Sequence, residues 1–298
     1  MSNFLLIFIC LGAGMILQRR RDMPESAALA LNLYVVYMAL PALVLAQMPK
    51  LTFSTDLLVP IVMPWAMLAV GAFLVLLGRR LFHWSREVTG CLLLCVPLGN
   101  TSFLGIPMVT AFFGADMVPY AVIYDQLGSF IALSTYGTLV LASYQEGSRP
   151  QLKAIVTKIV TFPPFLALVL AFALLPYDYP AALVVTLERI GASLVPVVMV
   201  AVGLQLKIRL PGPYVVPFGH GLLVKLVVAP LVALFACKAL GLESDAARIA
   251  VFEAGMPPMV TAGALALAAG LATELAAALV GWGIVISFVT LSGLYWLM

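Results

Sequence analysis

Long apolar segments separated by short polar connections run through the whole chain. A helix needs about 20 apolar residues to cross the hydrocarbon core of a membrane, and most of these segments are apolar on every face, as expected where lipid and other helices surround them. The pattern predicts an all-α polytopic membrane protein with ten transmembrane helices, at residues 3–18, 27–48, 57–78, 88–114, 117–143, 153–175, 182–206, 214–237, 246–270 and 274–297.

Composition excludes an ordinary soluble domain. The chain is 63% hydrophobic and 10% charged, whereas soluble domains are about a quarter charged. The net charge of +3 is small, so we expect no nucleic-acid partner. Cys91 and Cys95 are four residues apart, a spacing that forms no zinc or redox motif, and we expect neither a metal nor a cofactor.

Basic residues are unevenly distributed among the connections. Cytoplasmic connections carry an excess of Lys and Arg. The odd-numbered connections hold Arg19, Arg20, Arg21, Arg79, Arg80, Arg86, Arg149, Lys153, Lys158, Lys207 and Arg209, whereas the even-numbered ones hold only Lys50, Lys238 and Arg248. The bias predicts that both termini of this multi-pass inner-membrane protein lie in the periplasm.

The two halves of the chain resemble each other. Pro41 and Pro196 are 155 residues apart, and Gly114 and Gly270 are 156 apart. The hydrophilic break at residues 145–151 separates a first repeat, residues 1–145, from a second, residues 150–298. Each repeat holds five spans, so the second is inverted in the membrane, an arrangement typical of secondary transporters.

The fourth and ninth spans are interrupted at corresponding places. The fourth contains Pro97, Gly99, Gly105 and Pro107, and the ninth contains the sequence GMPP at residues 255–258. Proline removes a backbone donor, and in hydrocarbon a freed backbone group is tolerated only inside protein or beside a water-filled cavity. Paired interruptions of this kind point to a binding site at mid-membrane, although simple proline kinks are the alternative.

The interruptions predict a site for an anion such as a carboxylate. A helix that resumes after a break presents unpaired N–H groups and about half a positive charge. The carbonyls that end the preceding half-helices could hold a cation or a proton-bearing group. The residues expected to contact substrate are Asn100, Thr101, Ser102, Pro257, Pro258 and Thr261.

Three ionisable residues lie deep inside predicted spans, where charge is costly and usually functional. Glu253 and Asp125 are candidates for proton or ion coupling, because burial disfavours the charged form of a carboxyl. The alternative is a structural carboxyl bonded to a neighbour such as Tyr124 or Gln126. Lys225 is expected to neutralise a carboxyl or the substrate, and snorkelling to the surface is its alternative.

Other polar residues in the spans have simpler expected roles. Asn32 and Gln47 should form hydrogen bonds between helices. Glu188 and Arg189 are adjacent, so they point to different helix faces and should not pair with each other.

Several segments resemble one known family. Residues 99–107 (GNTSFLGIP) resemble the fourth helix of bacterial members of the auxin efflux carrier family, within the group of bile-acid, arsenite and riboflavin transporters. Residues 37–43 (YMALPAL) resemble the second helix of that family, residues 196–206 the seventh and residues 255–258 the ninth.

The resemblance implies two inverted five-helix repeats with crossing, broken helices 4 and 9. It implies a scaffold of helices 1, 2, 6 and 7 that often forms a homodimer, and a transport part of helices 3–5 and 8–10. The crossover asparagine of the family corresponds to Asn100, and its crossover proline to Pro257 or Pro258. Met256 stands where plant carriers often have an asparagine.

We therefore expect a secondary transporter of small organic anions that works by alternating access, with protons as the coupling ion. A sodium-coupled symporter of the bile-acid type is one alternative, and a receptor or sensor derived from a transporter is another. An enzyme is not expected, because the sequence has no His-Glu-x-x-His, Gly-x-Ser-x-Gly or Gly-x-Gly-Asp motif.

Overall fold

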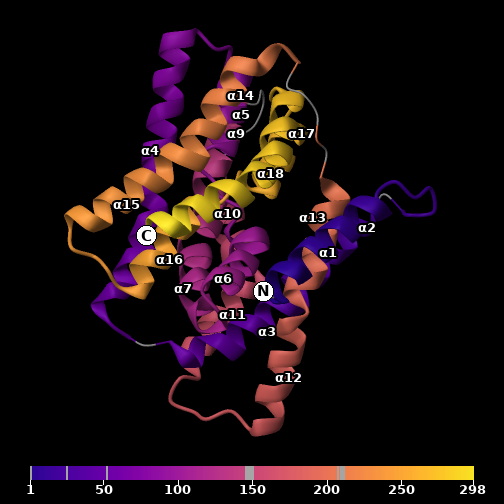
Figure 1. The fold of residues 1–298 in the computed structure, drawn as a ribbon, viewed down its shortest axis with the longest axis vertical. Coiled ribbons are helices and arrows are strands. Elements are labelled where there is room, and N and C mark those ends of the chain that lie inside the picture. Colours follow the sequence, from indigo (N-terminus) through magenta and orange to yellow (C-terminus); the bar gives the residue numbers. More distant parts are fainter. Residues whose placement is uncertain (1, 25, 52, 145–150, 207, 209–211) are drawn as a thin grey trace. The chain divides into compact units, whose positions relative to one another are not determined.

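The computed structural model describes residues 2–24, 26–51, 53–144, 151–206, 208 and 212–298. Within these residues the regular elements are helices (Figure 1), and Gly99 and Pro258 form an isolated antiparallel β-bridge. The α-helices are α1 (Ser2–Leu17), α2 (Ala27–Tyr34), α3 (Leu40–Gln47), α4 (Leu58–Phe82), α5 (Arg86–Cys95), α6 (Ile106–Phe112), α7 (Val118–Ile123), α8 (Phe130–Ala132), α9 (Thr138–Tyr144), α10 (Leu152–Val160), α11 (Pro163–Ala173), α12 (Ala181–Ala192), α13 (Leu194–Gln205), α14 (Val215–Leu223), α15 (Ala229–Ala239), α16 (Asp245–Ala254), α17 (Val260–Ala268) and α18 (Thr273–Leu297).

Short segments of other helix types join several of these helices into longer rods. The π-helical segments are Val35–Ala39, Thr101–Gly105, Tyr124–Ser129, Leu133–Gly137 and Val224–Val228, and the 3-10 segments are Met48–Lys50, Thr55–Leu57, Ala115–Met117 and Gly212–Tyr214. Two π-helical segments end just before Pro41 and Pro230. Because proline cannot donate the hydrogen bond of a regular helix, the wider turn lets the rod continue past it.

The long apolar rods confirm a polytopic membrane protein. Among the described residues, six helical rods are long and apolar enough to cross a membrane: Ala27–Lys50, Thr55–Phe82, Ala115–Tyr144, Ala181–Gln205, Gly212–Ala239 and Thr273–Leu297. A bent pair, α10 with α11, raises the number to seven. The count of ten spans and the inverted repeats stay predictions, because the other expected spans are short or broken helices.

The sixth expected span, residues 153–175, is bent rather than continuous. Its two helices, α10 and α11, meet at an angle of 59°. Phe162 adopts an extended conformation immediately before Pro163, the first residue of α11. The residue before a proline is disfavoured in the helical region, so the Pro163-Pro164 pair starts a new helix.

The chain divides into two compact units, each assembled from three separate stretches. The first, which we call unit 1, comprises Met1–Ser54, Ser102–Val122 and Thr157–Leu206. The second, unit 2, comprises Thr55–Thr101, Ile123–Val156 and Lys207–Met298. The expected repeat boundary at residues 145–151 lies almost entirely outside the described residues, as do Arg149, Lys207 and Arg209.

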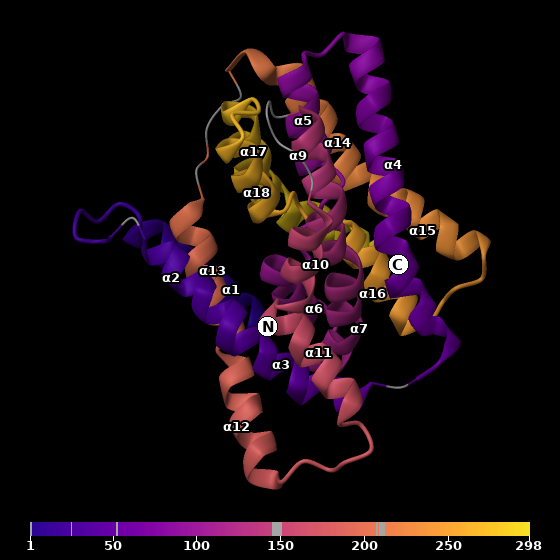
Figure 2. The same cartoon turned by 180° about the vertical axis from the view of Figure 1, so that it is seen from behind.

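Unit 1 is held together by close contact between α1 and α13, which lie side by side in both views (Figures 1 and 2). Gly14 of α1 faces Gly203 of α13 across this contact. A Cβ at Gly14 would collide with the carbonyl oxygen of Val200, and one at Gly203 with that of Leu11. Small residues of this kind let two membrane helices approach backbone to backbone. The other main contacts of the unit pack α3 against α11 and α12.

Unit 2 packs α5 against α9, α14, α17 and α18 around a buried apolar cluster (Figure 2). The helix α4 packs against α16 and against the π-helical segment Tyr124–Ser129. Gly71 of α4 brings its backbone against Pro97, because a Cβ there would lie 3.2 Å from the Pro97 Cα. Unit 2 holds the breaks that follow α5 and α16, with Pro97 and Gly99 in the first of them. Gly105 and Pro107, which were expected to belong to the first break, lie instead in helical segments of unit 1.

The α1–α13 contact predicts that Gly14→Leu destabilises the protein by about 1–3 kcal/mol, as overpacking typically does. The matched control is Gly12→Leu on the same helix, because a Cβ at Gly12 has nothing within 4 Å. The thermal midpoint of detergent-purified protein should fall for Gly14→Leu alone. Equal midpoints for the two variants would contradict this packing.

Candidate functional site

The two helix breaks of unit 2 meet each other. The non-helical residues 96–100 follow α5, and residues 255–259 follow α16. The Asn100 N–H donates to the Pro257 carbonyl at 2.8 Å, and the Met259 N–H donates to the Leu98 carbonyl at 3.0 Å. These bonds frame the bridge between Gly99 and Pro258. Each break therefore satisfies backbone groups that the other leaves without a helical partner.

Glycines allow the breaks to pack this tightly. A Cβ at Gly283 of α18 would lie 2.6 Å from the Pro258 Cδ. A Cβ at Gly99 would lie 3.0 Å from the Lys225 Nζ. The approach of α18 to the Pro258 ring requires glycine at position 283, whereas an added Cβ at position 99 would push the Lys225 ammonium away from the break. The pairing of the breaks thus brings the Lys225 ammonium against the backbone of the first break.

Asn100 and Thr101 lie at the end of the first break and differ in their hydrogen bonding. The Thr101 hydroxyl donates to Asp125 Oδ1 at 2.6 Å, and Gln126 Nε2 donates to Asp125 Oδ2 at 2.7 Å. Both oxygens of the buried Asp125 carboxyl are therefore satisfied, Gln126 being the neighbour expected from the sequence. The Asn100 side chain is 3% exposed, and its Nδ2 has no hydrogen-bond partner. A buried donor left free in this way is available to a ligand.

Glu253 and Lys225 lie beside the second break. Glu253 is completely buried, and neither of its carboxyl oxygens has a hydrogen-bond partner. It interacts electrostatically with Asp125 and with Lys225. The Lys225 Nζ donates to the Ala254 carbonyl at 3.4 Å. Instead of the close ion pair expected with a carboxyl, the ammonium bonds to the carbonyl that ends α16.

A small cavity connects these groups. Thr101, Tyr124, Lys225 and Glu253 all line it, and its volume is about 10 Å³. This is close to the smallest space that holds one water molecule. The charged groups are thus enclosed by protein, where electrostatic interactions are stronger than in water.

The remaining expected site residues are placed differently. Pro257 and Pro258 are buried in the second break. Thr261, the second residue of α17, is exposed, and so it does not join the buried cluster. Ser102 is half-buried in the π-helical segment Thr101–Gly105 and belongs to unit 1.

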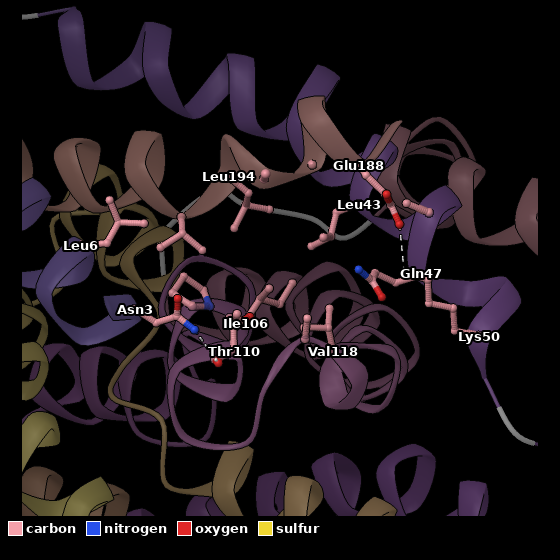
Figure 3. A pocket seen from close by; sticks show the side chains of 16 residues that line it. Asn3, Leu6, Leu43, Gln47, Lys50, Ile106, Thr110, Val118, Glu188 and Leu194 are labelled. Atoms are coloured by element: carbon pink, nitrogen blue, oxygen red, sulfur yellow. Dashed lines mark hydrogen bonds and ion pairs between the residues drawn. The ribbon is translucent and has the colours of Figure 1, made fainter. Parts of the chain in front are cut away.

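Unit 1 contains a larger cavity that the sequence did not predict. Its volume is about 410 Å³, within the range of small-molecule sites. Figure 3 shows its walls, which come from α1, α3, α6, α7, α12 and α13 and include the apolar side chains of Leu6, Leu43, Ile106, Val118 and Leu194. A cavity of this size and lining can hold a small molecule with an apolar body.

Polar groups line one part of this cavity. Lys50 and Glu188 form an ion pair at 3.1 Å (Figure 3). Gln47 is 8% exposed, and its Oε1 has no partner. The hydrogen bond expected for Gln47 is therefore not formed through this oxygen, and the same holds for Oδ1 of Asn32. This partner of Glu188 could not be predicted from the sequence, because Lys50 is 138 residues away along the chain.

Long apolar rods, together with buried polar groups where two broken helices meet, define a membrane transporter. The chain belongs to the membrane transport protein family, whose model matches residues 1–295, and this is the auxin efflux carrier family that residues 99–107 resemble.

Two archaeal proteins described as uncharacterized transporters are similar to this chain. One, from Methanocaldococcus jannaschii, is 28% identical over 247 residues, which cover 78% of this chain and 77% of the relative. The other, from Methanothermobacter thermautotrophicus, is 27% identical over 295 residues, which cover 97% of this chain and 95% of the relative. Family and relatives agree that this chain is a transporter and not an enzyme.

The free amide of Asn100 predicts that Asn100→Ala abolishes transport while leaving the fold intact. The substitution removes a donor that has no partner to lose within the protein. Uptake by proteoliposomes and the thermal midpoint of the same preparation should be measured together. Asn32→Ala, which removes an amide from α2, is the matched control. Normal uptake by Asn100→Ala would show that Asn100 does not hold the substrate.

Proposed function

We propose that the protein is a secondary transporter of small organic anions, and that it holds a carboxylate where the breaks of helices 4 and 9 cross. The observation that carries this proposal is the unpartnered Nδ2 of the buried Asn100, beside paired breaks and a buried ammonium. Family membership supports transport, and the chemistry of the crossing supports an anion.

The donors around the crossing suit a carboxylate. The second half-helix of the ninth span, α17, begins at Val260, and a helix N-terminus offers free N–H groups and a positive dipole end. Asn100 Nδ2 adds a neutral donor, and the Lys225 ammonium adds a positive charge. A carboxylate accepts hydrogen bonds on two oxygens, so it can use a backbone donor and a side-chain donor together.

The charges of the crossing favour protons as the coupling ion. The cluster holds two carboxyls, Asp125 and Glu253, and one ammonium, Lys225. Asp125 accepts two hydrogen bonds, which stabilise its charged form. Glu253 accepts none, so a proton on Glu253 would leave the cluster neutral. We propose that Glu253 carries the coupled proton, with Tyr124 as the other titratable group that faces it.

Alternating access would follow from two inverted repeats, residues 1–145 and 150–298. The entering half-helices of spans 4 and 9 support this arrangement, because α5 and α16 each have 10 residues. Each is preceded by a serine whose side-chain oxygen accepts a hydrogen bond from a backbone N–H, Ser85 from Val88 and Ser244 from Ala247. Each is followed by a five-residue break. The two segments therefore share a serine cap, the helix length and the length of the break.

We further propose a scaffold of helices 1, 2, 6 and 7 and a transport part of helices 3–5 and 8–10. The composition of unit 1 supports this division, since it gathers residues 1–54 and 157–206 from the four scaffold spans together with residues 102–122. Unit 2 gathers most of the remaining spans. We also propose a homodimer in the bacterial inner membrane, as the family resemblance implies. The Lys and Arg bias of the connections supports a periplasmic position of both termini.

The proton-carrier proposal predicts that Glu253→Gln changes the pH dependence of transport. The amide imitates the protonated carboxyl, so the variant at high pH should behave as the wild type does at low pH. Uptake should be measured from about pH 5 to pH 8, where acidic conditions protonate a buried carboxyl. Glu243→Gln in the exposed connection before α16 is the control. An unchanged pH profile would remove Glu253 from the coupling step.

A thermal-shift screen tests the substrate class. Purified protein is heated with mono- and dicarboxylates, each in sodium and in sodium-free buffer. A bound substrate should raise the thermal midpoint by about 2–5 °C at saturation, because ligands stabilise the folded state that binds them. Asn100→Ala should lose this rise. No rise with any carboxylate would argue against organic anions, and a rise that requires sodium would favour the sodium-coupled alternative.

A further inference from the structure

The first half-helix of the ninth span ends at a carbonyl that receives an unusual partner. The last carbonyls of a helix lack intrahelical donors and carry the negative end of its dipole. After α16, the Gly255 N–H donates to Phe252 and the Met256 N–H donates to Glu253. The next carbonyl, that of Ala254, accepts a hydrogen bond from the Lys225 Nζ. A side-chain cation therefore completes the C-terminal end of α16.

The ammonium is held at this place by its surroundings. Lys225 lies in the π-helical segment Val224–Val228, in the middle of the rod Gly212–Ala239, and is 4% exposed. Its Nζ lies 3.0 Å from the position that a Gly99 Cβ would take. The ammonium is thus packed between the end of α16 on one side and the first break on the other.

The groups around this position would suit a small free cation equally well. Carbonyl and carboxylate oxygens are the ligands that hard cations prefer, and the ends of interrupted half-helices coordinate ions in transporters. The Ala254 carbonyl bonds to the Lys225 ammonium, and the Glu253 carboxyl interacts electrostatically with it, so both provide oxygens of this kind. Neither carboxyl oxygen of Glu253 has a hydrogen-bond partner in the protein.

We propose that the Lys225 ammonium is a built-in counter-ion that fills a monovalent-cation site at the crossing of the two breaks. The protein consequently binds no free sodium there, and removal of the ammonium opens the site to sodium or lithium. One consequence of this proposal rests on the proposed function: a filled cation site would explain why protons rather than sodium are the coupling ion. The site itself follows from the contacts of Lys225.

The test compares thermal midpoints in sodium chloride and in choline chloride at equal ionic strength of about 150 mM, so that screening is the same in both. Wild-type protein should give the same midpoint in both salts. Lys225→Ala should give a midpoint higher by about 3 °C or more in sodium, because a bound ion stabilises the folded state. Lithium should act in the same direction.

Three further proteins make the comparison specific. Lys238→Ala removes an exposed lysine from the end of α15 and should respond to neither salt. Lys225→Gln keeps most of the side-chain stem and should fold where Lys225→Ala is poorly recovered, with a sodium-dependent rise of its own. Addition of Glu253→Gln to Lys225→Ala removes a carboxylate ligand and should abolish the rise.

A sodium-dependent rise in the wild-type protein would overturn the proposal. Folded Lys225→Ala and Lys225→Gln with equal midpoints in both salts would also overturn it, as would failure of both variants to fold in every salt. Recovery of folded Lys225→Ala in sodium but not in choline would support it. The midpoint measurement needs no substrate. The proposed organic-anion transport is therefore tested separately, by carboxylate uptake into wild-type proteoliposomes in sodium-free buffer.

Discussion

The need to pair every backbone N–H and C=O inside a membrane governs the centre of this protein. Prolines and glycines interrupt two helices, and each interruption frees backbone groups that hydrocarbon cannot solvate. The breaks at residues 96–100 and 255–259 solve this problem for each other through the Asn100–Pro257 and Leu98–Met259 hydrogen bonds. Because neither break is satisfied alone, the two segments are fixed together, and the polar side chains on them are fixed as well.

The side chains around the crossing differ mainly in whether they are satisfied. Asp125 accepts bonds from Thr101 and Gln126, whereas Glu253 and the amide nitrogen of Asn100 have no partner. Glu253 and Lys225 line an enclosed space of about 10 Å³, which has room for about one water molecule. In the function proposed here, a proton on Glu253, a substrate at Asn100 and the ammonium of Lys225 would act on one another, and an ion-driven transporter requires such coupling.

Glycine has two distinct uses in the two units. In unit 1, Gly14 and Gly203 bring α1 and α13 together along a regular helix contact, which stabilises the packing of intact helices. In unit 2, Gly99 lets the buried Lys225 ammonium approach the non-helical backbone of the first break, and Gly283 lets α18 approach the Pro258 ring of the second. The second use brings an ionisable group, the Lys225 ammonium, to the contact, and it occurs where the helices are broken.

Local sequence determined the class of the protein, the position of its breaks and its family, because apolar length and proline and glycine content act on the residues that carry them. It also located Asn100, Glu253, Asp125 and Lys225 as candidates, since charge and amide groups in apolar spans stand out without any fold. Only the tertiary structure decided their partners. In the folded protein Lys225 donates a hydrogen bond to the Ala254 carbonyl, and Lys50 forms an ion pair with Glu188. Gln47 Oε1 has no hydrogen-bond partner, and Thr261 is exposed. These outcomes depend on helix packing between residues from 29 to 138 positions apart, and no local pattern encodes such distances.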